Sequence, residues 1–371
     1  VLGAALLMLP KATTFDNIYG RAPFRHALNC LFTATSAACV TGLTVYDTGT
    51  DFTLFGQVVI LVLIQLGGLG IMIFGSVMGL LLGRQLSIRE STLMQDVLSH
   101  QTLGEIRQIV LFIVTFTLVA ETIGAIALHP IWTEAPQGLR GFHSIFHAVS
   151  AFCNAGFGLY PDSLVRFRGH WQVYGVIMPL IILGGLGFPM LYEFHERIAA
   201  RLRRANPSRR RYHLSLHSRM VLTMTVVLIL AGAAILWIGE GHRSLSHDAA
   251  MASADQMAAM TPGQRGLAAL FQSVTARTAG FNTVSLDVGR MSPGSHFLLC
   301  VLMFIGGSPG STAGGVKTVT IMVMILTIAA TLRRRDNVEA FARTIPLRLV
   351  RRAAALVMIS LLLVRDRKSV V

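Results

Sequence analysis

The stretch LFTATSAACVTGLTV, residues Leu31–Val45, returns in altered form as IFHAVSAFCNAGFGL at Ile145–Leu159 and as LFQSVTARTAGFNTV at Leu270–Val284. Each copy begins with a short amphipathic stretch that is rich in Ala, Phe and Ser or Thr. Because about 20 residues are needed to cross a bilayer, stretches of roughly 10 to 14 residues predict re-entrant half-helices. Each half-helix leads to a central glycine, and these glycines are Gly42, Gly156 and Gly280.

A second landmark follows each central glycine. A long apolar segment carries a pair of glycines 25, 28 and 26 residues downstream, and these pairs are Gly67-Gly68, Gly184-Gly185 and Gly306-Gly307. Near-equal offsets in three copies predict an internal repeat of helix, pore-type helix, glycine-centred loop and helix. A lone glycine in a membrane helix more commonly serves close packing, and we keep that interpretation for the first two pairs.

The composition places these repeats in a membrane. The chain has 371 residues, of which 53% are hydrophobic and 13% charged, against about 25% charged in a soluble domain. This excludes a disordered chain, a disulfide scaffold and an ordinary cytosolic enzyme. The excess of 32 Lys+Arg over 18 Asp+Glu would suit a nucleic-acid binder, but such proteins are less apolar, so we expect no nucleic-acid partner.

Long apolar segments predict an all-α polytopic membrane protein in the lipid bilayer. Four of them are nearly free of charge, namely Phe52–Gly83, Gln108–Pro130, Trp171–Tyr192 and Met220–Gly239. The second holds one carboxylate, Glu121, which we interpret as structural. A fifth segment, His296–Leu332, is broken by GGSPGSTAGG at Gly306–Gly315 and carries Lys317.

The charges of the loops predict the orientation. The loops Arg84–Arg107, Glu193–Arg219 and Arg333–Arg352 hold 18 Lys+Arg and 7 acids, whereas the opposite side holds 10 and 9. Basic loops remain in the cytoplasm, so we expect a multi-pass protein of the cell membrane with these loops inside. Within them RRANPSRRR, Arg203–Arg211, is a topological signal or, as the alternative, a site for anionic lipid or a partner.

The glycine-centred loops predict chemistry as well as fold. Irregular backbone at membrane depth must line a cavity, and a half-helix C-terminus directs partial negative charge into that cavity. Glycine lets successive carbonyls turn inward, and rings of carbonyls coordinate dehydrated potassium. We therefore predict cation permeation. Arg277, three residues before Gly280, is expected to point away from the ions, while Asn154 and Asn282 are candidates to buttress the loops.

The third long segment predicts a gate. Pro309 and five glycines make an unbroken helix across Gly306–Gly315 improbable, and the segment follows the third glycine loop closely. Lys317 has two interpretations: its side chain reaches the cytoplasmic interface, or it holds the gate segment closed.

At this point the sequence resembles a known family. CVTGLTVYDTGTDFTLFGQVVILVLIQLGGLGIM (Cys39–Met72) is similar to the first repeat of the Trk/Ktr/HKT superfamily of potassium transporters. ARTAGFNTVSL (Ala276–Leu286) and MFIGGSPGSTAGGVKT (Met303–Thr318) resemble its third repeat. The greatest resemblance is to the bacterial Ktr-type membrane subunit, with the Trk type second.

The resemblance implies specific residues. The carbonyl groups of its selectivity filter fall on Val40, Thr41 and Gly42, on Asn154, Ala155 and Gly156, and on Thr278, Ala279 and Gly280. Its intramembrane gating loop falls on Gly306, Gly307, Ser308, Pro309, Gly310, Ser311, Thr312, Ala313, Gly314 and Gly315. It further implies K⁺ as transported ion, Na⁺ as activator, a homodimer with one pore per subunit, and a cytoplasmic nucleotide-binding regulatory subunit.

The family has four repeats around each pore, and we assign three here. They are residues 1–83, 84–192 and 193–332, with 333–364 as the start of a fourth and 365–371 as an artefactual tail. We accordingly expect the chain to be truncated at both ends. The alternatives to a potassium pore are a secondary symporter of the Trk type, coupled to protons or sodium, and a membrane-embedded enzyme. Because the apolar segments offer no HExxH motif, paired carboxylates or Ser/His/Asp set, we do not expect an enzyme.

Overall fold

The computed structural model describes residues 1–14, 23–84, 95–136, 138–202, 214–244, 257–286, 291–335, 337–341 and 343–366. The basic run Arg203–Arg211 and the end of the chain beyond Asp366 lie outside the described residues. Within them the chain is mostly helical, as the apolar segments predicted.

The elements follow the order of the predicted segments. Up to the middle of the chain they are α1 (Leu2–Leu7), α3 (Pro23–Ala38), α4 (Leu54–Arg84), α5 (Gln95–Leu128), η1 (His129–Ile131), α6 (Arg140–Phe152), η2 (Val165–Phe167), η3 (Val173–Ile177), α7 (Met178–Leu186) and α8 (Phe188–Leu202). The others are α9 (Leu216–Ser244), η5 (Met257–Ala259), α10 (Pro262–Thr275), α11 (Pro293–Phe304), α12 (Thr318–Leu332), β1 (Glu339–Ala340), β2 (Arg343–Thr344) and α13 (Leu347–Asp366).

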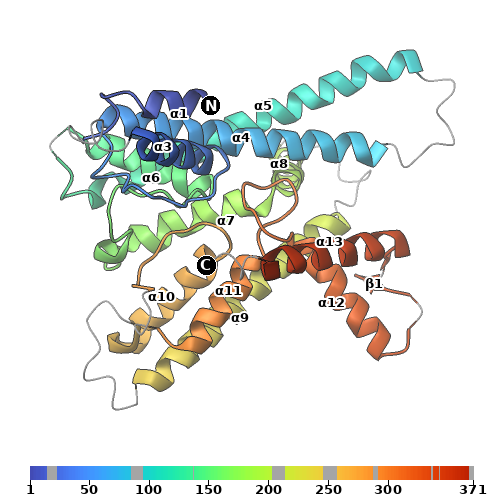
Figure 1. Ribbon diagram of the computed structural model, residues 1–371. Helices are drawn as coiled ribbons and strands as arrows, with labels where there is room; N and C mark the ends of the chain where they lie inside the picture. Colours follow the sequence, from blue (N-terminus) through green and yellow to red (C-terminus); the bar gives the residue numbers. More distant parts are fainter. Residues whose placement is uncertain are drawn as a thin grey trace.

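Three described helices are long and apolar enough to cross a bilayer. The qualifying segments are Leu54–Phe74 in α4, Arg107–Ile131, which joins the end of α5 to η1, and Leu216–His242 in α9. In Figure 1, α4 and α5 run side by side along one edge of the molecule, and α9 lies on the opposite side with α10 and α11. The short helices α3, α6 and α10 have 16, 13 and 14 residues and pack on α4, α5 and α9, respectively.

The predicted span Trp171–Tyr192 is not one straight helix. It begins as a π-helical turn, η3, continues as α7, and breaks after Leu186, where α8 departs at 102°. Gly187 occupies the break with φ +85°, a conformation that L-residues with side chains rarely adopt. A Cβ atom there would lie 2.6 Å from the carbonyl oxygen of Pro309. Contact with a segment more than 100 residues away therefore overrides the apolar pattern.

The third long segment breaks where the sequence predicted. Helix α11 ends at Phe304 and α12 begins at Thr318, so the residues between them, which include the glycine-rich Gly306–Gly315, are not helical. The base of this excursion is closed by two backbone hydrogen bonds, Gly306 N–H to Val316 O at 3.1 Å and Val316 N–H to Phe304 O at 3.0 Å.

Candidate functional site

The three central glycines and the residues two positions before them share one backbone conformation. The φ angles are +55° and +80° at Val40 and Gly42, +56° and +72° at Asn154 and Gly156, and +72° and +82° at Thr278 and Gly280. We call residues 40–42, 154–156 and 278–280 the first, second and third glycine loops. Left-handed residues this frequent fit neither a helix nor a strand. Among the described residues, none of the nine backbone carbonyls of these loops accepts a hydrogen bond.

The three loops meet in space although they are far apart in the chain. A Cβ atom on Gly42 would collide with the carbonyl oxygen of Ala155 in the second loop. A Cβ atom on Gly156 would lie 2.8 Å from the carbonyl oxygen of Ala279 and 3.0 Å from Cα of Gly280. Glycine is thus required twice at these positions, by the positive φ and by the approach of the neighbouring loop.

Each glycine loop directly continues a half-helix. In the first two copies the chain closes the helix with an N–H to the carbonyl five residues back, Thr41 to Ser36 and Ala155 to Ser150, both at 2.8 Å. In the third copy Ala279 N–H reaches Thr275 O, four residues back, at 2.9 Å. This difference matches the step from Ser or Thr to glycine, which is one residue shorter in the third copy.

The Ser or Thr hydroxyl groups near the end of two half-helices bond to the residue that directly follows the glycine loop, a role that we did not predict. The Ser150 hydroxyl donates to the carbonyl of Phe157 at 2.7 Å. The Thr275 hydroxyl donates to the carbonyl of Phe281 at 2.8 Å and accepts from its N–H at 2.9 Å. Ser36 is equivalent in sequence, but its buried hydroxyl has no partner within the described residues. The recurring Ser or Thr was the signal that could have identified this contact.

Two histidines and a tryptophan pack beside the second loop and contact the residues that follow it. His147 is fully buried in α6, its Nδ1–H donates to the carbonyl of His143 at 2.8 Å, and its Nε2 accepts from the N–H of Leu159 at 3.4 Å. The ring stacks on Trp132 with centroids 4.3 Å apart. These contacts fix a neutral imidazole beside the second loop. No pattern in the sequence indicated the contacts with Leu159 and Trp132, because they join His147 to residues outside its own helix.

The glycine pairs of α4 and α7 serve packing, as interpreted. A Cβ atom on Gly67 would collide with the carbonyl of Ala38, the last residue of α3, and one on Gly184 with the carbonyl of Phe152, the last residue of α6. The pairs let each long helix lie directly against the end of the half-helix before it. The pair in α7 has a further role, because its carbonyl oxygens accept hydrogen bonds from the Gly306–Gly315 segment.

The loop Gly306–Gly315, called the 306–315 loop below, docks on the break between α7 and α8. Ser308 N–H donates to Gly185 O at 3.0 Å, Thr312 N–H to Gly184 O at 3.2 Å, and Phe188 N–H to Gly310 O at 3.1 Å. Two of these acceptors belong to the second glycine pair. The 306–315 loop is therefore hydrogen-bonded to residues on both sides of the break between α7 and α8.

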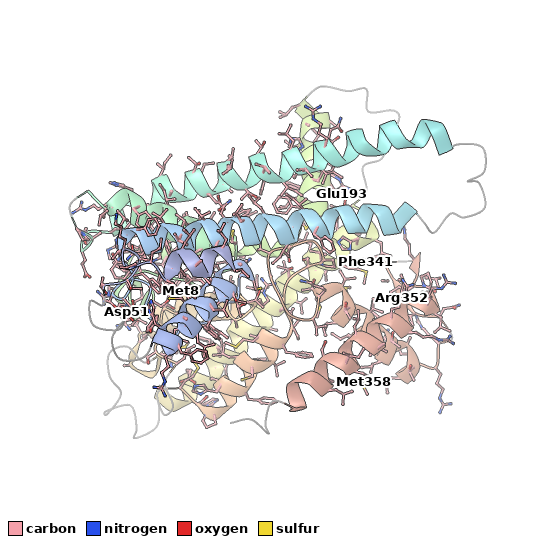
Figure 2. The ribbon with its side chains drawn as sticks, turned by 45° about the horizontal axis from the view of Figure 1, so that its top comes forward. Met8, Asp51, Glu193, Phe341, Arg352 and Met358 are labelled. Carbon is pink, nitrogen blue, oxygen red and sulfur yellow. The ribbon has the colours of Figure 1, made fainter. Side chains whose placement is uncertain are left out.

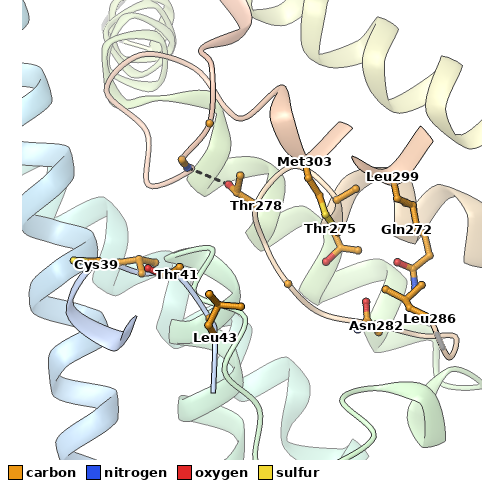
Figure 3. Close-up of a pocket in the computed structure, with 16 residues that line it drawn as sticks. Cys39, Thr41, Leu43, Gln272, Thr275, Thr278, Asn282, Leu286, Leu299 and Met303 are labelled. Atoms are coloured by element: carbon orange, nitrogen blue, oxygen red, sulfur yellow. Dashed lines mark hydrogen bonds between the residues drawn. The ribbon is translucent and has the colours of Figure 1, made fainter. Parts of the chain in front are cut away.

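The same loop is tied to two glycine loops. The Asn154 side-chain amide donates to the Thr312 hydroxyl at 2.7 Å, and the Thr312 hydroxyl donates to the carbonyl of Phe152 at 3.3 Å. Gly314 N–H donates to the Thr278 hydroxyl at 3.1 Å, as Figure 3 shows. Asn154, a candidate to buttress its own loop, therefore connects it to the 306–315 loop.

Lys317 lies at the start of α12 and folds back on the 306–315 loop. Its Nζ donates to the carbonyl of Ala313 at 2.6 Å, and the residue is partly buried. This contact favours the second of the two interpretations of Lys317, an interaction with the candidate gate segment.

A cavity of about 500 Å³ opens between the first and third glycine loops. Its lining includes Thr41, Gly42, Thr278, Gly280 and Gly314, so it adjoins both loops and the 306–315 loop (Figure 3). Two further charged residues belong to the segments around the loops, Arg277 and Glu121. Neither of them lines this cavity.

Arg277 and Glu121 are both buried. Arg277 is 6% exposed, and its Nε has no partner within the described residues. Glu121 is 5% exposed and lies 3.9 Å from Sγ of Cys153, the residue before the second loop. The described residues that line the cavity beside the loops thus include no charged side chain.

Comparisons with known proteins show the family of the chain. Residues 5–364 match the TrkH family, described as cation transport protein. The chain is 38% identical to Ktr system potassium uptake protein B of Bacillus subtilis, over 98% of this chain and 75% of that protein. It is 36% identical to the protein of the same name from Vibrio alginolyticus, over 90% of this chain and 69% of that protein.

A third relative and a solved structure extend the comparison. Potassium/sodium uptake protein NtpJ of Enterococcus hirae is 33% identical over 97% of this chain and 74% of its own length. The crystal structure of the potassium transporter TrkH from Vibrio parahaemolyticus has a similar fold, with a TM-score of 0.62 at 21% identity, over 89% of this chain and 62% of that chain. The family match over nearly the full length, joined by relatives above 30% identity, establishes that this chain belongs to the TrkH family of cation transport proteins and not to a family of enzymes.

Proposed function

We propose that the protein takes up potassium across the cell membrane and that the three glycine loops form part of its selectivity filter. The observation that carries the proposal is the set of nine backbone carbonyls, on three loops that meet, with no hydrogen-bond donor among the described residues. Carbonyl oxygens of this kind can replace the water shell of K⁺. The C-termini of α3, α6 and α10 lead into the loops, and their partial negative charge favours a cation there. The names of the relatives, as potassium uptake proteins, support the same ion.

The 306–315 loop is the proposed gate. It bonds to the second loop through Asn154 and to the third through Thr278, so its position is coupled to that of the filter. Lys317 holds the loop through Ala313. Opening would break these hydrogen bonds and move the loop away from the glycine loops.

The charges of the loops support one orientation of the chain in the membrane. We propose that the filter faces the outside and that the basic loops face the cytoplasm, since the loops between helices are richest in arginine on one side. A homodimer and a cytoplasmic nucleotide-binding regulatory subunit are proposed on the resemblance to the Ktr type.

Coupled transport is the second candidate. A relative named potassium/sodium uptake protein supports a role for Na⁺, either as an activator or as a coupled ion, in a symporter of the Trk type. The two candidates differ in one measurable respect: an activator changes the rate of K⁺ uptake without itself crossing the membrane. Uptake of ²²Na⁺ in a fixed ratio to K⁺ would favour coupling to sodium. Dependence of K⁺ uptake on an imposed proton gradient would favour coupling to protons.

The experiment for the main proposal is complementation of a bacterium that lacks its own potassium uptake systems. The full-length gene, expressed with its regulatory subunit, should restore growth at low K⁺ and the uptake of Rb⁺. Growth unchanged from the empty vector, with the protein demonstrably in the membrane, would contradict potassium uptake.

A further inference from the structure

An arginine-rich segment joins α12 to α13. Residues 333–352 contain seven arginines, no lysine and two acidic residues. The arginine side chains are all exposed, and none of the ion pairs between described residues involves them; they are Arg333, Arg334, Arg335, Arg343, Arg348, Arg351 and Arg352. We call this segment the arginine hairpin.

The backbone of the arginine hairpin is held in place where it leaves α12. Arg334 adopts φ +53°, and its N–H donates to Thr331 O at 3.0 Å, while Arg335 N–H donates to Ala330 O at 2.9 Å. This pair of bonds is the Schellman ending of a helix. Because α12 ends in a defined turn, the first three arginines start from fixed backbone positions at the negative end of the helix dipole.

The middle of the segment is a two-stranded hairpin with a buried underside. Glu339 pairs with Thr344 and Ala340 with Arg343, and Ile345 N–H donates to Val338 O at 2.7 Å. Ala340 and Ile345 are buried in a cluster with Met220 of α9 and Val323 of α12. The arginines of β2 and α13 therefore belong to a folded part of the chain, which we call the platform.

The platform lies at the boundary between apolar and polar surface. Leu332, directly before the first arginine, is 80% exposed, Leu347 beside Arg348 is 61% exposed, and Phe341 at the tip of the hairpin is 43% exposed. Figure 2 shows Phe341 and Arg352 near one end of the α12–α13 pair, with the exposed Met358 farther along α13. In a membrane protein, apolar side chains next to a cationic band mark the level of the lipid headgroups.

The chemistry of the cations points to one ligand group. All seven basic residues here are arginine, in a chain whose only lysines are Lys11, Lys317 and Lys368. The guanidinium group presents a planar fork that binds phosphate through two parallel hydrogen bonds, which an ammonium group cannot do. Arg348 and Arg352 lie one turn apart on α13, so two forks can address one headgroup region.

We infer that the arginine hairpin binds the phosphate groups of anionic phospholipids in the leaflet that it faces. The apolar residues beside it contact the acyl chains, and the arginines neutralise the headgroups. The inference rests on the membrane setting of the chain and not on the filter, so lipid binding and potassium uptake can fail independently.

The test compares two double variants of the whole purified chain. Arg348→Gln/Arg352→Gln removes two charges from the arginine hairpin, and Arg25→Gln/Arg140→Gln removes two exposed charges elsewhere. Native mass spectrometry in detergent measures binding of phosphatidylglycerol and of phosphatidylcholine with the same acyl chains. We expect the first variant to lose phosphatidylglycerol affinity by roughly ten- to thirtyfold and the second to keep it, with phosphatidylcholine binding equal in all proteins.

Two further measurements keep the test decisive. Arg348→Lys/Arg352→Lys retains the charge and should give an intermediate loss, because the forks are gone. A tryptophan introduced by Phe341→Trp should be quenched more by brominated phosphatidylglycerol than by brominated phosphatidylcholine. Equal phosphatidylglycerol affinity in all variants would overturn the inference and assign the arginines to another partner, such as an acidic protein surface.

Discussion

The hydroxyl groups of Ser150 and Thr275 hold the second and third glycine loops from behind, and Ser36 offers a natural comparison. Ser150→Ala leaves the carbonyl of Phe157 without its donor, and a lost buried hydrogen bond costs about 1 kcal/mol. We expect lower discrimination of K⁺ against Na⁺ in flux assays, because the second loop loses its support.

Ser36→Ala is the matched control for this prediction. Its hydroxyl has no partner within the described residues, so its removal should change neither stability nor selectivity. An equal loss of selectivity in both variants would show that the hydroxyl contact at Phe157 has no specific role.

Lys317 gives a prediction for the gate. Lys317→Met removes the hydrogen bond from Nζ to Ala313, and a bond with a charged donor is worth about 1.5–3 kcal/mol. We expect the rate of Rb⁺ uptake to rise by roughly tenfold or more, because the 306–315 loop is released. Lys11→Met, which removes an exposed lysine far from Lys317 in the sequence, should leave the rate of Rb⁺ uptake unchanged. A rate in Lys317→Met that equals the wild-type rate would argue against a restraining role for Lys317.

At the scale of elements, the apolar pattern predicted most helices, but it could not predict how they end. The half-helices and the interruption of His296–Leu332 could be predicted, because length and glycine content are local properties. The bend at Gly187 could not, since its cause is the carbonyl of Pro309, which approaches from another repeat. Gly187 also follows a continuous apolar run, in which nothing marks it as different from a packing glycine.

The candidate site was predictable to a similar extent. The central glycines recur at fixed offsets, so they could be identified from the sequence, and the structure brings their loops together. The contacts that hold the loops, such as Asn154 to Thr312 and His147 to Leu159, join positions that share no spacing. Side-chain contacts between distant segments leave no periodic signal in a single sequence.

At the scale of the whole molecule, the asymmetry of charge predicts an orientation that can be measured. In a background in which the exposed Cys39 and Cys300 are replaced by serine, Arg335→Cys should react with a membrane-impermeant thiol reagent only in inside-out vesicles. Lys11→Cys should react only in right-side-out vesicles, because it belongs to the opposite side. Reversed labelling would place the arginine hairpin outside the cell and contradict the orientation.

If the carbonyls of the glycine loops select the ion, a substitution at Gly156 must change the selectivity. Gly156→Ala adds a methyl group into contact with Ala279 and Gly280 at a residue with φ +72°, whereas Gly141→Ala adds the same group in open space on α6. The measurement is the ratio of K⁺ to Na⁺ uptake in proteoliposomes that contain equal amounts of each protein. We predict that Gly156→Ala abolishes the preference for K⁺ or all uptake, while Gly141→Ala retains the wild-type ratio. An unchanged ratio and rate in Gly156→Ala would contradict the account.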